Sequence, residues 1–145
     1  MVLLKLKKID ENAVIPKYAH EGDAGMDLYS TKQYLLKPGE IVLVSTGLKF
    51  EVPEGYELQI RPKSGLALKY GITMPNSPGT IDAGYRGELG VIIINHGKED
   101  FKINPGDKIA QAILNKIEKA EIKIVEELSE TSRGDGGFGS TGFRK

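Results

Sequence analysis

The last segment of the chain combines phosphate donors with an isolated aromatic ring. It reads Arg133-Gly-Asp-Gly-Gly-Phe-Gly-Ser-Thr-Gly142. Closely spaced glycines let backbone N–H groups converge on an anion. The hydroxyls of Ser140 and Thr141 add donors, and the Arg133 guanidinium is a planar fork for phosphate. Phe138 lies between glycines, where a ring can stack on a flat ligand. A flexible linker with one chance phenylalanine fits this composition equally well.

A second candidate anion site is Arg61-Pro-Lys-Ser-Gly-Leu-Ala67. Pro62 and Gly71 bound a short predicted helix that runs from Ser64 to about Lys69. The free N–H groups and the dipole of its first turn attract phosphate, and Lys63 adds charge. For this segment alone, the favoured interpretation is an ordinary serine-initiated helix with solvated charges.

A third candidate is the segment Asn76-Ser-Pro-Gly-Thr-Ile-Asp-Ala-Gly-Tyr-Arg-Gly-Glu88. Asp82 lies among apolar residues and glycines just before a predicted hairpin, where a carboxylate can act as a general base towards water. Tyr85 is rigid and could pack against a sugar or a base. The competing interpretation is a turn in which Asp82 accepts backbone hydrogen bonds and Tyr85 belongs to the core.

Two further segments are weaker signals. Asp27 stands in Ala24-Gly-Met-Asp-Leu28, which alone is more typical of a turn than of a site. Gln111 is a neutral donor between small residues, and a structural glutamine is the default there. His20 and His96 lack a metal-ligating partner, so we assign them no role. No Ser-His-Asp arrangement is apparent.

Composition limits the elements that could position these residues. The 145 residues fit one domain, and the absence of cysteine excludes disulfides and thiolate metal sites. Lys+Arg and Asp+Glu are both 20, so no global field attracts nucleic acid. The charged N-terminus lacks a signal-peptide core, and no apolar run approaches the ~20 residues of a membrane span. We therefore expect a cytoplasmic protein with no nucleic-acid or membrane partner.

Glycines and prolines punctuate short apolar runs, which is the pattern of an all-β barrel or sandwich. Leu4 and Leu6 alternate with lysines, which indicates a half-buried strand. Val91–Ile94 is β-branched and short, so we expect a strand buried on both faces. Lys108–Leu128 fits either helical spacing or two strands. From Ser129 onward the chain is polar and glycine-rich, which predicts a mobile tail.

Taken together, the segments resemble the five motifs of the trimeric dUTPase family (deoxyuridine 5'-triphosphate nucleotidohydrolase), in the family's order and over nearly the whole chain. The five segments are Ala24–Ser30, Arg61–Ala67, Asn76–Glu88, Phe101–Ile113 and Arg133–Gly142. One departure is Lys63, where family members usually have arginine. Lysine keeps the charge but loses the bidentate fork.

The resemblance implies an all-β fold, a distorted jelly-roll β-barrel with one short helix, assembled as a homotrimer. It implies a barrel domain over residues 1–128 and a flexible glycine-rich tail over residues 129–145 that completes a neighbouring active site. It also implies that Lys108–Val125 is mostly strand.

For activity, the resemblance implies Mg²⁺-dependent hydrolysis of dUTP to dUMP and pyrophosphate by water attack on the α-phosphate. That reaction limits uracil incorporation into DNA and supplies dUMP for thymidylate synthesis. Asp82 would activate the water, and Tyr85 would pack under deoxyribose. The residues implied to bind substrate are Lys63, Ser64, Gly65, Asn76, Tyr85, Gln111, Arg133, Phe138, Gly139, Ser140 and Thr141. Mg²⁺ would bind the triphosphate and water, without a direct protein ligand and with Asp27 as a possible outer-sphere contact.

Two other functions compete with this one. A dCTP deaminase would share the fold but would need a glutamate placed for deamination and would lack the glycine-rich tail. A non-catalytic nucleotide-binding jelly-roll protein is the other alternative, because fold does not fix function. Asp82, Tyr85 and the tail argue against it.

Overall fold

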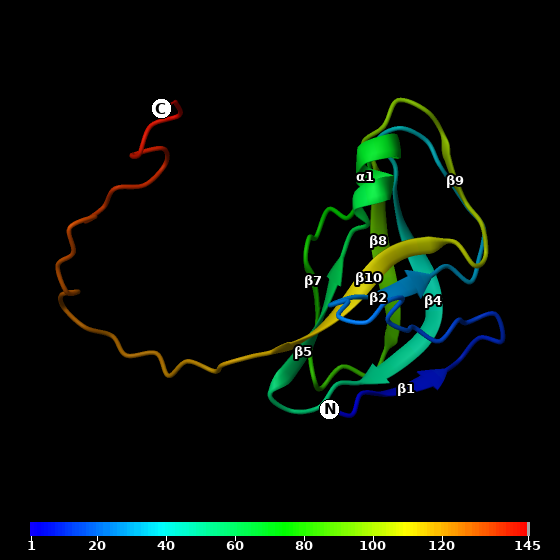
Figure 1. Ribbon diagram of the computed structural model, residues 1–145, viewed down its shortest axis with the longest axis horizontal. Helices are drawn as coiled ribbons and strands as arrows, with labels where there is room; N and C mark the ends of the chain where they lie inside the picture. The colour runs from blue at the N-terminus through cyan, green and yellow to red at the C-terminus, as the bar shows by residue number, and fades with distance from the viewer. Residues whose placement is uncertain (145) are drawn as a thin grey trace.

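A computed structural model describes residues 1–144, and almost all of its regular structure is β (Figure 1). In chain order the elements are β1 (Lys5–Lys8), β2 (Met26–Tyr29), β3 (Tyr34–Leu36), β4 (Ile41–Glu51), β5 (Tyr56–Arg61), α1 (Ser64–Tyr70), β6 (Ile72–Thr73), β7 (Gly79–Ile81), β8 (Glu88–Asn95), β9 (Phe101–Ile103) and β10 (Lys108–Lys116). This confirms the predicted all-β class with one short helix.

The strands form two four-stranded antiparallel sheets and one small ribbon. One sheet has the order β1-β4-β8-β6, the other has the order β2-β10-β5-β7, and β3 pairs with β9. Both large sheets contribute side chains to one buried apolar cluster, with Val44 and Val91 from the first and Leu28 and Leu58 from the second. This shared core fixes the backbone of the second sheet, which carries most of the candidate site.

The predicted helix is confirmed, because α1 begins at Ser64 and ends at Tyr70. Gly71 ends it in the left-handed conformation, at φ 68°, and its N–H donates to the carbonyl of Ala67 at 3.0 Å. A Cβ on Gly71 would lie 2.7 Å from the backbone nitrogen of Gly97. Glycine is therefore required here both for its conformation and for the close approach of a second loop.

The expectation that Val91–Ile94 is buried on both faces is wrong for the single chain. Along β8, Val91 and Ile93 are buried, whereas Ile92 and Ile94 on the opposite face are partly exposed. On β4, the cross-strand partner of Ile92 is Leu43 and that of Ile94 is Ile41, and these are 63% and 59% exposed. A strand of an antiparallel sheet needs only one face against the core, and the other face of β8 remains open.

The predicted strand over Lys108–Val125 is correct only for its first part. β10 ends at Lys116 after 9 residues, and no helix forms in the segment. Up to Lys116 the strand pairs with β5, and up to Ala112 also with β2. Beyond that point the chain leaves the sheets (Figure 1), and Ile122 and Ile124 are 90% and 95% exposed. Without a neighbouring strand, the apolar alternation cannot form a ladder.

Residues 117–144 contain neither helix nor strand and run away from the sheets (Figure 1). Short turns form locally, such as the hydrogen bond from the Gly136 N–H to the Arg133 carbonyl at 3.0 Å. The predicted tail boundary at residue 129 and the mobility of the tail stay predictions. Within residues 1–144, no helix has both the length and the apolar character needed to cross a membrane.

Candidate functional site

One sheet brings together four of the five predicted segments. In the order β2-β10-β5-β7, Asp27 pairs with Gln111, and Gln111 pairs with Arg61. One residue along β5, Ile60 pairs with Gly79 at the start of β7. Segments far apart in the sequence therefore lie on adjacent strands in a defined register.

A buried carboxylate with two lysine partners is the electrostatic centre of this region. The Asp27 side chain is 10% exposed and forms ion pairs with Lys63 and with Lys108, the latter at 2.8 Å. Burial alone would raise the pKa of Asp27, but the hydrogen bonds from Lys108 and Lys63 outweigh it and lower the pKa. The same contact raises the pKa of Lys108. Asp27 is thus an ionised anchor that orients two cations.

Gln111 completes a polar cavity of about 350 Å³ with these three residues. Its Nε2 donates to the carbonyl of Pro62 at 3.0 Å, which ties β10 to the residue before Lys63. A Cβ on Gly25 would lie 2.6 Å from the Gln111 Oε1, so glycine leaves room for the amide. Two ammonium groups and an amide around one cavity are donors suited to a polyanion.

The start of α1 adjoins this cavity, because Lys63 is its N-cap. Ser64 and Gly65 are exposed in the first turn. No side chain caps that turn, so its first N–H groups have no side-chain acceptor.

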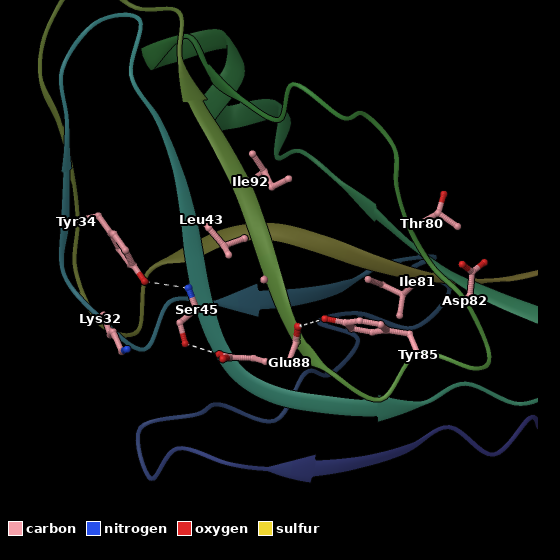
Figure 2. A pocket seen from close by; sticks show the side chains of 11 residues that line it. Lys32, Tyr34, Leu43, Ser45, Thr80, Ile81, Asp82, Tyr85, Glu88 and Ile92 are labelled. Atoms are coloured by element: carbon pink, nitrogen blue, oxygen red, sulfur yellow. Dashed lines mark hydrogen bonds between the residues drawn. The ribbon is translucent and has the colours of Figure 1, made fainter.

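Asp82 and Tyr85 lie together in the turn between β7 and β8. The Tyr85 N–H donates to the Asp82 carbonyl at 3.1 Å, and both side chains are exposed. The Tyr85 hydroxyl donates to the carbonyl of Glu88 at 3.0 Å, which fixes the orientation of the ring. Asp82 and Tyr85 line a cavity of about 410 Å³ (Figure 2). The alternative that placed Tyr85 in the core is wrong, because 46% of this residue is exposed.

Asn76 lies in the loop that precedes β7, and it is exposed. Its Nδ2 would be 3.3 Å from a Cβ on Gly79, so it lies directly over the first residue of the strand. Asn76 and Asp82 therefore stand near opposite ends of β7.

The tail residues form a third, separate group. Arg133 donates from its Nε to the Gly136 carbonyl at 2.7 Å, within the tail itself. Phe138 is fully exposed in the left-handed region at φ 47°, and Gly139 follows at φ 93°. Ser140 and Thr141 are also exposed. Within this single chain, the tail lies away from the sheets that carry both cavities (Figure 1).

Sequence reasoning missed two residues that the structure places in these groups. Lys108 pairs with Asp27, but this contact follows from the pairing of β10 with β2, which the sequence does not display. Glu88 was assigned no role, yet its carboxylate accepts a hydrogen bond from Ser45 on β4. A charged residue at the beginning of an otherwise apolar strand was the available signal for Glu88.

The chain is similar to known proteins of one family. Residues 11–142 match the dUTPase family model. The deoxyuridine 5'-triphosphate nucleotidohydrolase of Clostridium acetobutylicum is 56% identical over 145 residues, with full coverage of both chains. That of Clostridioides difficile is 56% identical over 143 residues, which is 99% of this chain and all of the relative.

Solved structures give the same result. The dUTPase of Staphylococcus bacteriophage 80alpha with dUPNHPP superposes with a TM-score of 0.92 at 30% identity, covering 99% of this chain and 100% of that one. A mutant dUTPase of phage phi11 of S. aureus, described with a structural Mg(II) ion, has a TM-score of 0.82 at 30% identity and covers 87% and 98%. Fold, site and relatives together define a nucleotide-hydrolysing enzyme. The chain belongs to the dUTPase family.

Proposed function

We propose that this protein hydrolyses dUTP to dUMP and pyrophosphate, with Mg²⁺ on the triphosphate, in a cytoplasmic homotrimer of jelly-roll barrels. The main support for this proposal is the strand register of the second sheet. In that register Gln111 pairs with Asp27 on one side and with Arg61, two residues before Lys63, on the other. The resulting cavity has the donors that a triphosphate requires. Membership in the dUTPase family narrows the ligand to a deoxyuridine nucleotide.

In the proposed mechanism, Asp82 is the general base. Its exposed carboxylate takes a proton from a water molecule as the water oxygen bonds to the α-phosphorus. The bond from the α-phosphorus to the oxygen bridging to the β-phosphate breaks, and pyrophosphate leaves. Phosphoryl-transfer catalysis depends mainly on positioning and charge stabilisation, which the remaining residues supply.

Lys63, Ser64, Gly65 and Gln111 bind the phosphates in this proposal. Asp27 holds Lys63 and Lys108 at the cavity wall, so both ammonium groups are in place before the substrate arrives. Preorganised charge of this kind avoids reorganisation during the reaction.

Tyr85 and Asn76 select the nucleoside in this proposal. The hydrogen bond from Tyr85 to the Glu88 carbonyl holds the ring at one orientation, and a deoxyribose packed on it leaves no space for a 2′-hydroxyl. Asn76, together with the hairpin backbone beyond Tyr85, reads the uracil edge. Phe138 stacks on the base when the tail closes, and Arg133, Gly139, Ser140 and Thr141 add phosphate contacts.

Trimer formation explains why the site residues form three separate groups in one chain. An open apolar face on β4 and β8, which includes Leu43 and Ile92, is available for subunit contact. Residues 117–128 carry exposed isoleucines and lead outward from the sheets. In a closed cyclic trimer, each tail can reach a neighbour in the same rotational sense.

The acidic and histidine side chains of the protein are also compatible with Mg²⁺ bound mainly by the substrate. Within residues 1–144, no group of three or more Asp, Glu or His side chains is arranged to hold an ion. Asp27 is engaged by two lysines, which supports the proposal that its contact with the ion is outer-sphere. Mg²⁺ keeps several waters and binds substrate phosphates readily, so the ion would neutralise triphosphate charge while Lys63 and Gln111 orient the phosphates.

The decisive experiment is pyrophosphate release from dUTP, measured with Mg²⁺ and with excess chelator, and compared with dCTP and UTP. We expect turnover of dUTP that requires Mg²⁺, with far slower reaction of the other two nucleotides. Ammonia release from dCTP would instead indicate a deaminase, and binding of dUTP without pyrophosphate release would indicate a non-catalytic protein.

A further inference from the structure

We propose that Glu88 is a positioning residue for sugar selection: its carboxylate fixes the main-chain carbonyl to which Tyr85 is hydrogen-bonded. The inference rests on the role proposed above for Tyr85. It adds a residue that does not touch the substrate but sets the position of one that does.

The carboxylate of Glu88 fills a gap in the ladder between β4 and β8. The register of these strands shifts between Ser45 and Lys49, and Gly47 within the shift has φ 66°. A bulge of this kind leaves backbone groups without a ladder partner. The Gly47 N–H donates instead to the Glu88 carboxylate at 2.9 Å. The side chain therefore locks the first residue of β8 to the irregular part of β4.

A second donor reaches the same carboxylate oxygen, because the Ser45 hydroxyl also donates to Glu88 (Figure 2). Ser45 is itself fixed. Its N–H donates to the Tyr34 hydroxyl at 3.0 Å, and the Thr31 hydroxyl lies 3.0 Å from its Oγ. The carboxylate thus meets donors that are already in place, which gives a defined position rather than a loose surface contact.

The link to Tyr85 is the carbonyl of the same residue. The Tyr85 hydroxyl donates to the Glu88 carbonyl at 3.0 Å, as Figure 2 shows. Gly87 lies between them, and a Cβ there would overlap the Tyr85 hydroxyl, so the ring packs directly on the backbone before Glu88. A shift of the first residue of β8 would therefore move the acceptor and the surface that orient the ring.

Four variants test this chain of contacts. Glu88→Ala removes the acceptor for both donors, whereas Glu88→Gln keeps an oxygen that can accept from both. Thr46→Val is the matched control, because the buried Thr46 hydroxyl donates to the Leu89 carbonyl across the same two strands at 2.6 Å and does not contact Tyr85. Tyr85→Ala reports the full effect of losing the ring.

The readout is the ratio of kcat/KM for UTP to that for dUTP. We expect Glu88→Ala to raise this ratio roughly five- to tenfold, as loss of a hydrogen-bonded constraint permits, mainly through KM. We expect Glu88→Gln to stay within about twofold of wild type. Thr46→Val should lower the thermal midpoint and leave the ratio unchanged. A Glu88→Ala ratio equal to wild type, while Tyr85→Ala raises it, would overturn the inference.

A second readout does not depend on substrate. The chain has 6 tyrosines, and labelling with 3-fluorotyrosine gives each of them a ¹⁹F resonance. The resonance of Tyr85 is assigned as the one that disappears in Tyr85→Phe. Glu88→Ala should shift or broaden the Tyr85 resonance, and Thr46→Val should not. If Tyr85→Ala leaves the ratio of kcat/KM for UTP to that for dUTP unchanged, the proposed role of Tyr85 in sugar selection fails. The ¹⁹F spectrum then still decides whether Glu88 positions the ring. Should Glu88→Ala not fold, Ser45→Ala removes one of the two donors, and an unmoved resonance would again overturn the inference.

Discussion

Replacing Asp27 by asparagine should destabilise the protein in a pH-dependent way. The Asp27 carboxylate is nearly buried and accepts hydrogen bonds from Lys63 and Lys108. Asparagine keeps the shape of the side chain but removes the charge. Two ammonium groups then face a neutral amide, whose NH₂ group is itself a donor.

The size of the effect follows from the exposure of the partners. Removing one partner of a fully buried ion pair costs about 3–5 kcal/mol. Here the lysine side chains are 30% and 50% exposed, so water can hydrate them after the carboxylate is lost. We therefore expect a loss of about 1–2 kcal/mol. For a chain of this size that corresponds to a fall in the thermal midpoint of roughly 3–8 °C.

The pH dependence has a definite sign. The pKa of Asp27 lies below its ordinary value of 3.8, because the two lysine hydrogen bonds outweigh the opposing effect of burial. A carboxyl group with a lowered pKa in the folded state stabilises the fold above its unfolded pKa and loses that contribution as the pH falls through the folded value. The stability difference between wild type and Asp27→Asn should thus be constant at neutral pH and shrink below about pH 4.

The assay is urea unfolding at several pH values, at one fixed protein concentration because the proposed trimer would make stability depend on concentration. Glu51→Gln is the control, since Glu51 forms an exposed pair with Lys5 that should contribute nothing measurable. An Asp27→Asn variant as stable as wild type at neutral pH would refute the anchoring role. So would a stability difference that persists undiminished at the lowest pH.

Three further predictions concern the reaction. Asp82→Asn should lower turnover by about 10²–10⁴ while dUTP binding stays nearly intact, and a turnover within tenfold of wild type would exclude Asp82 as the base. Tyr85→Ala should raise UTP turnover relative to dUTP in steady-state kinetics, and an unchanged ratio would count against steric selection. Amide hydrogen exchange over residues 133–142 should slow sharply with a non-hydrolysable dUTP analogue. Equal exchange with and without the analogue would show that the tail does not close on the ligand.

Local signals predicted the local elements well. The short helix was found because Pro62 and Gly71 bound it, and Gly71 adopts the left-handed conformation that ends a helix. The alternation of Leu4 and Leu6 likewise indicated the strand that forms at Lys5–Lys8. In these cases the physical cause lies within a few residues of the element itself.

Features that depend on distant partners were not predictable in the same way. The apolar alternation continues past Lys116, but the strand ends where its neighbours in the sheet end. The β-branched composition of β8 does not reveal which face meets the core, because that depends on how the two sheets pack. The contacts of Lys108 with Asp27 and of Glu88 with Gly47 arise from strand pairing and from a register shift. A single sequence carries no local signal for either pairing partner, although the charged start of an apolar strand marks Glu88 itself.

In the proposed trimer, Asp82 and the tail at one active site come from different chains. One variant carries Asp82→Asn, and another is truncated after Glu130, so each homotrimer should be inactive or severely slowed for a different reason. The two are co-refolded, and mixed trimers are confirmed by native mass spectrometry. In a trimer with one Asp82→Asn chain and two truncated chains, one site can pair an intact Asp82 with the tail of the Asp82→Asn chain. We predict that pyrophosphate release from dUTP reappears in the mixture, whereas a confirmed mixture no more active than the sum of its parents would contradict a site shared between chains.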